Sequence, residues 1–331
     1  MQVESDKFEA DGPTISVVIP GYKQAFLGSA LESLSKQTDR SFEVVVGDDG
    51  SPENLLQICN AFNDRLQLRY HRFDENLGSR SLVSHWSRSI DLAKGDWIWL
   101  MGDDDELEPR CIESVKSAIQ ASDPGIQLWH VDTVQIDADG NVIKDSVPFP
   151  ERLHPLDFVK GRMASHYSSF ACEYIFRKAE FHKRGGFLDF PLGWCSDDAT
   201  WIRLAAGTAI KTVRASEAKA RWRLSTQNIS GAGSAFHLPK LEARLLYLEW
   251  LCSADGRKSM GVSPCDELSL GATSLDWLLS CLHSTRTIVP AYLWWNTLHR
   301  LSAATHGNLL QVAWKMARMQ RWTRTAAGRS T

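Results

Sequence analysis

The chain has 331 residues, of which 43% are hydrophobic and 23% charged, and its formal net charge at pH 7 is -3. A chain of this length and apolar content can bury a sizeable core, as one large domain or as one domain with an extension. The near-neutral charge argues against bulk nucleic-acid binding. We therefore expect an ordinary globular protein.

Cysteine usage and the lack of long apolar runs indicate the compartment. The seven cysteines are odd in number, widely spaced and free of any Cys-x-x-Cys pair, which favours reduced thiols over a disulfide framework or a zinc site. The N-terminal residues 1–12 are acidic and polar and are expected to be flexible, and no stretch approaches the ~18 apolar residues of a membrane span. A cytoplasmic protein is predicted.

Four apolar runs in the first third of the chain alternate with segments of helical spacing. The runs, which are typical of buried strands, are residues 14–20, 42–46, 66–73 and 97–101. The segments between them, which space apolar residues as a helix does, are residues 27–34, 53–62 and 79–93. This alternation predicts an α/β fold with a mostly parallel sheet covered by helices.

Acidic residues follow two of these predicted strands. Asp48 and Asp49 end the second, and Asp103, Asp104 and Asp105 follow the fourth. Ligands of such sheets bind beyond the carboxyl ends of the strands, so both acidic loops are expected at one crevice. Three adjacent carboxylates repel one another, which suggests a divalent cation with an anionic ligand.

The pattern is less regular after residue 109. We expect a helix at 111–121, one strand at 126–136, a hairpin turn at 137–141 and a helix at 196–206. From residue 238 the chain is predicted to be helical, with breaks near 255–264 and at Pro290.

The C-terminal tail is basic and rich in tryptophan. No acidic residue follows Asp276, whereas the tail contains Arg286, Arg300, Lys315, Arg318, Arg321, Arg324 and Arg329. Helical spacing places an apolar stripe and a basic side on the segment 309–321. The tail is expected either to lie on an anionic membrane surface or to form a packed helical subdomain, and spacing does not choose between them.

Several short motifs occur together, in order, along the first 120 residues. They read ISVVIPGY from Ile15, QT from Gln37, FEVVVGDDGS from Phe42, NLG from Asn76, AKGDWI from Ala93 and DDD from Asp103. This set resembles the signatures of family 2 glycosyltransferases with the GT-A fold, strongly over residues 14–120 and more loosely over 121–235. The resemblance implies a GT-A domain at 13–235, followed by a helical extension at 236–331.

The resemblance also implies a donor site. Asp49 corresponds to the position that accepts a hydrogen bond from the uracil ring of a UDP-sugar, and an ionised carboxylate is a strong acceptor for a ring N–H. The alternative for Asp49 is an Asx-turn or a helix N-cap, whereas Asp48 is assigned to the turn. Pro20 and Tyr22 are expected at the nucleotide. Arg80 is either a diphosphate ligand or an exposed arginine that begins a helix.

A divalent metal is implied by the Asp-x-Asp arrangement. Asp103 and Asp105 would hold Mn²⁺ or Mg²⁺. Asp103 and Asp104 are also expected near the sugar donor. Because Asp104 lies between the other two, either neighbouring pair of carboxylates could bind the metal. The alternative is a solvated acidic turn ahead of a helix. Many relatives complete the metal shell with a histidine where this chain has Ser225, so water or His237 would replace it.

The catalytic base is expected within the sequence CSDDATWIR, which begins at Cys195. Family 2 enzymes use an Asp from an acidic pair ahead of a helix to deprotonate the acceptor hydroxyl. Keeping Trp201 and Arg203 in register favours Asp197, and a shift of one residue gives Asp198. The one that is not the base is expected to be an N-cap.

The resemblance therefore predicts an inverting, metal-dependent glycosyltransferase. It would move a sugar from a UDP-sugar to a hydroxyl of a glycan or lipid-linked acceptor, in cell-surface polysaccharide synthesis. A nucleotidyltransferase is one rival, although residues 20–24 lack the glycine-rich basic phosphate loop of that class. A catalytically silent glycan-assembly scaffold is the other.

Overall fold

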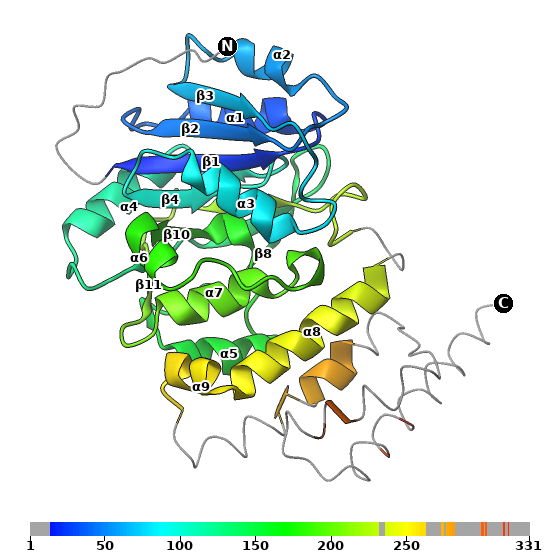
Figure 1. The fold of residues 1–331 in the computed structure, drawn as a ribbon. Helices are drawn as coiled ribbons and strands as arrows, with labels where there is room; N and C mark the ends of the chain where they lie inside the picture. Colours follow the sequence, from blue (N-terminus) through cyan, green and yellow to red (C-terminus); the bar gives the residue numbers. More distant parts are fainter. Residues whose placement is uncertain are drawn as a thin grey trace.

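A computed structural model describes residues 14–231 and 236–262, together with residues 273–274, 276–281, 299–300, 302, 314 and 317. A large sheet forms the centre, with helices on both faces (Figure 1). In spatial order its strands are β3 (Leu68–Arg72), β2 (Glu43–Asp48), β1 (Ile15–Gly21), β4 (Trp97–Leu100), β10 (Tyr174–Arg177), β6 (Leu128–His130), β11 (Ile210–Thr212) and β9 (Arg152–Leu153).

The first four strands of this order are mutually parallel, as the alternating pattern predicts. β10 then pairs antiparallel to both β4 and β6. The α/β class and the mostly parallel sheet are confirmed, and the acidic loops after β2 and β4 lie at the carboxyl edge on either side of β1.

Alternate residues of each central strand enter two different hydrophobic layers. In β1, Val17 and Ile19 join one buried cluster, whereas Val18 joins the other. Both faces are thus covered, which explains why these strands read as continuous apolar runs. The first layer is covered by α1 (Leu27–Ser35), α2 (Leu55–Asn60) and α4 (Cys111–Gln120).

The second layer contains most of the later helices. These are α3 (Leu82–Asp91), α5 (Pro155–Met163), α6 (Lys178–Lys183), α7 (Ser196–Leu204), α8 (His237–Cys252) and α9 (Ala254–Met260). Two 3-10 turns, η1 (Ala171–Glu173) and η2 (Pro191–Gly193), precede β10 and α7. Because α8 and α9 share this core with α5 and α7, the division at residue 235 stays a prediction.

A second sheet lies beside the first and differs from the sequence prediction. Its order is β5 (Glu106–Leu107), β12 (Ala220–Arg223), β7 (Thr133–Ile136) and β8 (Val142–Asp145). The single strand predicted at 126–136 is wrong, because β6 and β7 belong to different sheets. The chain crosses between them at Val131, whose N–H bonds Glu173, and Asp132, whose carbonyl accepts from Ala220. The hairpin that joins β7 to β8 is confirmed.

The predicted helix break at 255–264 is also largely wrong. The Ser253 side chain accepts a hydrogen bond from the Gly256 N–H (3.1 Å) and caps α9, which ends at Gly261 with a φ of 62°. The predicted break at Pro290 and most of the segment 309–321 lie outside the described residues. In the part of the chain that is described, no helix is long and apolar enough to span a membrane.

Candidate active site

Asp48, the last residue of β2, is held on both of its carboxylate oxygens. Oδ1 accepts from the Ser51 N–H at 2.7 Å, which closes the turn, and Oδ2 lies 2.7 Å from Nη1 of Arg72 and accepts from the hydroxyl of Tyr70. The assignment of Asp48 to the turn is confirmed.

Asp49 joins two loops and a helix. Its carboxylate accepts from the N–H groups of Leu77 (3.0 Å) and Gly78 (2.8 Å), and from Arg88 on α3. Nδ1 of His85 lies 3.1 Å from the same carboxylate, and burial lowers the pKa of His85 to about 4, so this imidazole is neutral at pH 7. The N-cap of α2 is Asn54, not Asp49. The nucleotide role of Asp49 stays a prediction.

The first and third members of the acidic triplet are committed to backbone groups. Oδ2 of Asp103 accepts from the N–H groups of Tyr22 (2.9 Å) and Lys23 (2.8 Å), so it fixes the loop after β1. Asp105 accepts from Gly102 N (3.2 Å) and from Arg223 N (3.1 Å). These bonds hold the two outer carboxylates in place.

The middle carboxylate has no such partner. In the described structure nothing donates to the Asp104 side chain apart from its own N–H, and burial, together with the charges of Asp105 and Asp103, raises its pKa to about 8. Burial likewise raises the pKa of Asp105 to about 6. A carboxyl group in this position needs a proton or a cation, so Asp104 is the triplet member available to an incoming ligand.

The metal assignment can be tested against these contacts. Among the described residues, no three His, Cys, Asp or Glu side chains gather into a group that could hold a metal ion. The chemistry of the site fits a cation held by Asp104, with diphosphate oxygens and water as further ligands. The assignment to Asp103 and Asp105 stays a prediction.

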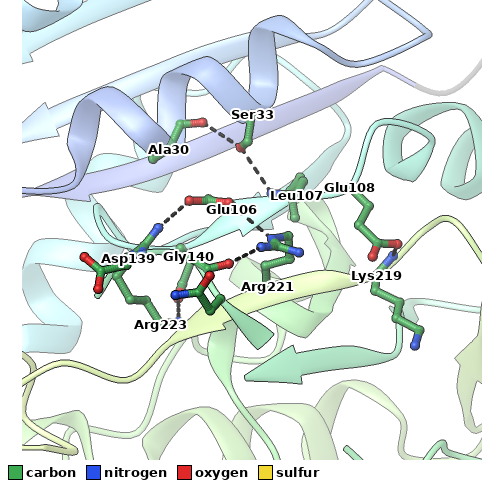
Figure 2. Close-up of polar contacts among 12 residues, drawn as sticks. Ala30, Ser33, Glu106, Leu107, Glu108, Asp139, Gly140, Lys219, Arg221 and Arg223 are labelled. Atoms are coloured by element: carbon green, nitrogen blue, oxygen red, sulfur yellow. Dashed lines mark hydrogen bonds and ion pairs between the residues drawn. The ribbon is translucent and has the colours of Figure 1, made fainter. Parts of the chain in front are cut away.

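A buried arginine fixes the backbone of the acidic loop. Arg223 on β12 is 2% exposed, and its guanidinium donates to the carbonyls of Asp104 (2.8 Å), Asp137 (2.8 Å) and Ala138 (3.0 Å), and to the Glu106 carboxylate. Figure 2 shows this arginine beneath the loop, near the turn of the β7–β8 hairpin. Arg223 therefore holds the chain on either side of Asp105.

Neighbouring contacts hold β5 from both sides. Nε of Arg221 lies 3.2 Å from Glu106, and its Nη2 donates to the Gly140 carbonyl at 2.7 Å (Figure 2). On the other side, the Leu107 N–H donates to Oγ of Ser33 on α1 at 3.1 Å. The acidic loop is thus fixed between β12 and α1.

The other residues predicted to bind the UDP-sugar are Tyr22, Pro20 and Arg80, and they differ in their contacts. The Tyr22 carbonyl accepts from Oγ of Ser51 at 2.6 Å, so Tyr22 connects the two acidic loops. Pro20 lies within β1 and its position pairs with Gly47 of β2. Arg80 is exposed and forms a 2.5 Å ion pair with Glu75. Their donor roles stay predictions.

His237 has cations, not carboxylates, as its charged neighbours. It begins α8, and burial together with the charges of Lys240 and Arg244 lowers its pKa. Ser225, at the position of the expected histidine, accepts a hydrogen bond from the Gln227 N–H at 3.3 Å. The metal role of His237 stays a prediction that gains no support.

The second acidic pair lies in the first turn of α7, whose N-cap is Cys195, so the N-cap role expected of one of the two is wrong. The pair separates into one held and one available carboxylate. Nε and Nη2 of Arg162 each lie 3.0 Å from Oδ2 of Asp198, which is 3% exposed. Among the described residues, only the backbone N–H groups of Asp198 and of Asp197 itself donate to the Asp197 carboxylate. Burial and the Asp198 charge raise the pKa of Asp197 to about 7. That value suits a general base at neutral pH.

The backbone ahead of this pair is strained. Leu192 and Cys195 have φ values of 63°, and of the described non-glycine residues only Ser165 shares a positive φ. Such residues cost on the order of 1–3 kcal/mol each and gather at functional sites. Between them, a Cβ on Gly193 would meet Trp86 of α3 at 3.3 Å. The loop ahead of Asp197 therefore sits against the helix whose Arg88 binds Asp49.

Three arginines that hold these carboxylates were not predicted from the sequence. Arg88, Arg162 and Arg223 lie 39, 36 and 118 residues from the Asp residues that they contact. Arg88 lies within the helix predicted at residues 79–93. That position is the one feature of the sequence that could have pointed to its role. Nothing local marks Arg162 as a partner of Asp198.

The mostly parallel sheet, with acidic segments after β2 and β4 at its carboxyl edge, is an α/β architecture of the GT-A type. Glycosyl transferase family 2 matches this chain over residues 16–180. Through this segment the chain belongs to family 2 of the glycosyltransferases.

Sequence relatives share the N-terminal part. Glycosyltransferase GlyG of Streptococcus pneumoniae serotype 4 is 30% identical over 131 residues, which are 38% of this chain and 42% of GlyG. A PGL/p-HBAD biosynthesis glycosyltransferase of Mycobacterium bovis is 37% identical over 98 residues, 29% of this chain and 37% of that protein. The chain thus spans less than half the length of these relatives.

Solved structures extend the similarity of fold to nearly the whole chain. S. aureus TarS 1-349 superposes with a TM-score of 0.66 at 15% identity, over 96% of this chain and 92% of that one. The same protein in complex with UDP-GlcNAc superposes with a TM-score of 0.62 over the same shares. The GT-A fold is confirmed.

Proposed function

We propose that this protein transfers a sugar from a UDP-sugar to a hydroxyl of a glycan or lipid-linked acceptor, with inversion at the anomeric carbon, in cell-surface polysaccharide synthesis. Membership of family 2 supports glycosyl transfer. Crystal structures of S. aureus TarS 1-349 in complex with UDP and with UDP-GlcNAc have a similar fold, which supports the choice of donor.

One observation carries this proposal. Each acidic segment of the site has one carboxylate to which no other described side chain donates, Asp104 in the triplet and Asp197 in the first turn of α7. Their neighbours Asp103, Asp105 and Asp198 are held by backbone N–H groups or by Arg162. A displacement needs one such group near the leaving diphosphate and another at the attacking hydroxyl.

The reaction would proceed in one displacement. Asp197, ionised above its pKa of about 7, takes the proton of the acceptor hydroxyl as that oxygen attacks the anomeric carbon. The bond from that carbon to the UDP oxygen breaks in the same step, and UDP leaves with the electron pair. A Mn²⁺ or Mg²⁺ ion at Asp104 would supply positive charge for the departing diphosphate.

The donor would bind along the loops after β1 and β2. Asp49 would accept from the uracil N–H, Tyr22 and Pro20 would border the nucleotide, and Arg80 would leave Glu75 to reach the diphosphate. Asp103 would position the Tyr22 loop through the two N–H groups that it binds.

The decisive experiment incubates the full chain with UDP-glucose, UDP-galactose and UDP-GlcNAc in Mn²⁺ and measures UDP release. Release with at least one donor, reduced in Asp197→Asn, supports the proposal. A protein that binds UDP and releases none from any donor, with or without an acceptor mixture, would be the silent scaffold.

Peripheral membrane contact through the tail is a separate proposal. It is supported by the excess of Lys and Arg after Asp276, each worth about 1 kcal/mol near an anionic surface. Two described tail residues instead pack on α8: Arg300 lies 2.7 Å from Glu242, and Trp277 lies 6.1 Å from Tyr247. The membrane contact is tested by sedimentation with anionic liposomes at low salt. The wild type is expected to sediment, and a variant with Lys315, Arg318 and Arg321 replaced by Gln is not.

A further inference from the structure

Helix α8 presents a row of basic side chains to the segment that carries the proposed base. His237, Lys240 and Arg244 are spaced by three and four residues, which places them on one face of the helix. Lys240 is 5% exposed and Arg244 6%, so both charges are buried. α8 packs against η2 and α7, the elements on either side of Trp194 and Cys195 (Figure 1).

The two buried cations have few partners in the protein. Nζ of Lys240 donates to the Ile229 carbonyl at 2.7 Å and lies 4.3 Å from the centre of the Trp194 ring. The Arg244 guanidinium lies 5.5 Å from the same ring. It makes no hydrogen bond or ion pair within the described residues, and its Nε is buried without a partner.

This isolation distinguishes Arg244 from two other arginines of the described chain, the half-buried Arg162 and the buried Arg223. Arg162 has Asp198 and Arg223 has Glu106 as carboxylate partners. The acidic residues of α8 itself, Glu242 and Glu249, both pair with Arg300. A buried guanidinium that lacks acceptors is costly, so Arg244 needs an anionic ligand, and the described residues supply none.

The position of this cluster relates it to the acceptor side of the site. Trp194 lies three residues before Asp197, and the Arg244 charge acts on the adjacent Cys195. Tyr247 continues the same face of α8, and its buried hydroxyl also lacks a partner. Among the described residues, the contacts of Lys240 and Arg244 do not include Asp49 or the Asp103–Asp105 triplet, where the donor is proposed to bind.

We infer that Arg244 and Lys240 form a subsite for a phosphate group of the acceptor, beside the base Asp197, so that the acceptor is a hydroxyl compound that carries a phosphate ester. This inference rests on the proposed function, because the bound phosphate compound is an acceptor only if the protein transfers a sugar. A tetrahedral phosphate offers several oxygens to the planar fork of Arg244 and a second charge to Lys240. The Trp194 ring, which lies 4.3 Å from Nζ of Lys240, would border the carbon skeleton.

The test measures binding of glycerol 3-phosphate to the full chain by calorimetry, with UDP and Mn²⁺ saturating. The wild type is expected to bind glycerol 3-phosphate and to ignore glycerol. Arg244→Gln and Lys240→Gln should each weaken this binding at least tenfold, and leave the affinity for UDP within twofold. Lys258→Gln, which removes an exposed charge from α9, is the matched control and should bind as the wild type does.

Several outcomes would overturn the inference. These are no binding of glycerol 3-phosphate by the wild type, equal binding of glycerate, or a tenfold loss of UDP affinity in Arg244→Gln, which would assign the cations to the donor. Should Arg244→Gln fail to fold, Arg244→Lys is the second variant, because it retains the charge without the planar guanidinium. Arg244→Lys is expected to bind glycerol 3-phosphate several-fold more weakly than the wild type. Unchanged binding in Arg244→Lys would also overturn the inference. Absence of UDP-sugar turnover contradicts the proposed function alone, because phosphate binding is measured without it.

Discussion

Arg162 donates from Nε and Nη2 to the same oxygen of Asp198, Oδ2, at 3.0 Å in each case. A third donor of the guanidinium, Nη1, bonds the Tyr167 carbonyl at 2.9 Å, so the arginine is itself fixed. The pair therefore holds Asp198 as a neighbouring negative charge and leaves Asp197 to the substrate. The register chosen from the sequence, with Asp197 as base, gains support from this division.

Replacing Asp197 by Asn should lower kcat by roughly 10²-fold or more, the usual effect of losing a positioned general base. The affinity for UDP should stay close to that of the wild type, because Asp197 is not among the residues proposed to bind the UDP-sugar. Asp198→Asn should cost less activity and more stability. Turnover and calorimetry on both variants check this, and a larger kcat loss in Asp198→Asn at unchanged melting temperature would assign the base to Asp198.

The pH profile should report the same carboxyl. Because the pKa of Asp197 is raised to about 7, kcat/KM should fall up to tenfold per unit as pH drops below about 7. Asp198→Asn removes a charge that raises this pKa, so the acidic limb should move to lower pH. Initial rates between pH 5 and 9 measure both, and an unmoved limb would show that the titrating group is not Asp197.

The acidic triplet should bind a cation in a pH-dependent way. The folded-state pKa values of Asp104 and Asp105 are raised from 3.8 to about 8 and about 6, so the free energy of unfolding falls as pH rises from 3.8 to those values and is constant above them. Below the folded-state pKa values, protons compete with the metal for these carboxylates. Mn²⁺ with UDP should therefore raise the melting temperature more at pH 8.5 than at pH 5.5. Thermal scans at both pH values measure this, with chelator as the control. Equal shifts in melting temperature at pH 8.5 and pH 5.5 would contradict the metal role.

The three members of the triplet should respond differently to substitution. Asp104→Asn should abolish the effect of Mn²⁺ on UDP affinity and leave the melting temperature unchanged or higher, because it removes an unpaired carboxyl. Asp105→Ala leaves the N–H groups of Gly102 and Arg223 unpaired and should cost about 1–3 kcal/mol of unfolding free energy. Urea denaturation and calorimetry separate the two effects. Loss of the Mn²⁺ effect in Asp103→Asn but not in Asp104→Asn would restore the pattern expected from the sequence.

Arg223→Met should destabilise the site and the fold together. It removes donors from the carbonyls of Asp104 and Asp137 and leaves the Glu106 charge without this partner, a loss of about 3 kcal/mol or more. The exposed Lys258→Gln is the control and should be within about 0.5 kcal/mol of wild type, as is usual for surface changes. Urea denaturation measures both, and a near-neutral Arg223→Met would mean that the acidic loop is held by other contacts.

The sequence by itself determined the layers of this protein. A period of two or 3.6 residues, the turn chemistry after each strand and the order of short motifs are local properties, so they predict the β1–β4 alternation and place Asp49 and Asp104 at the carboxyl edge. The same reasoning failed at residues 126–136. A continuous β pattern does not reveal that Val131 and Asp132 pass from one sheet to the other, because that passage depends on Glu173 and Ala220 far along the chain.

Tertiary structure alone decided which carboxylates are available. Asp103, Asp104 and Asp105 are chemically identical in the sequence, as are Asp197 and Asp198, and they differ only in the donors that the fold brings to them. Those donors come from distant segments, the loop after β1, β12 and α5, so no local pattern encodes them. The unpaired Arg244 likewise becomes visible only when α8 packs beside Trp194, because the absence of a partner is a property of the whole surrounding structure.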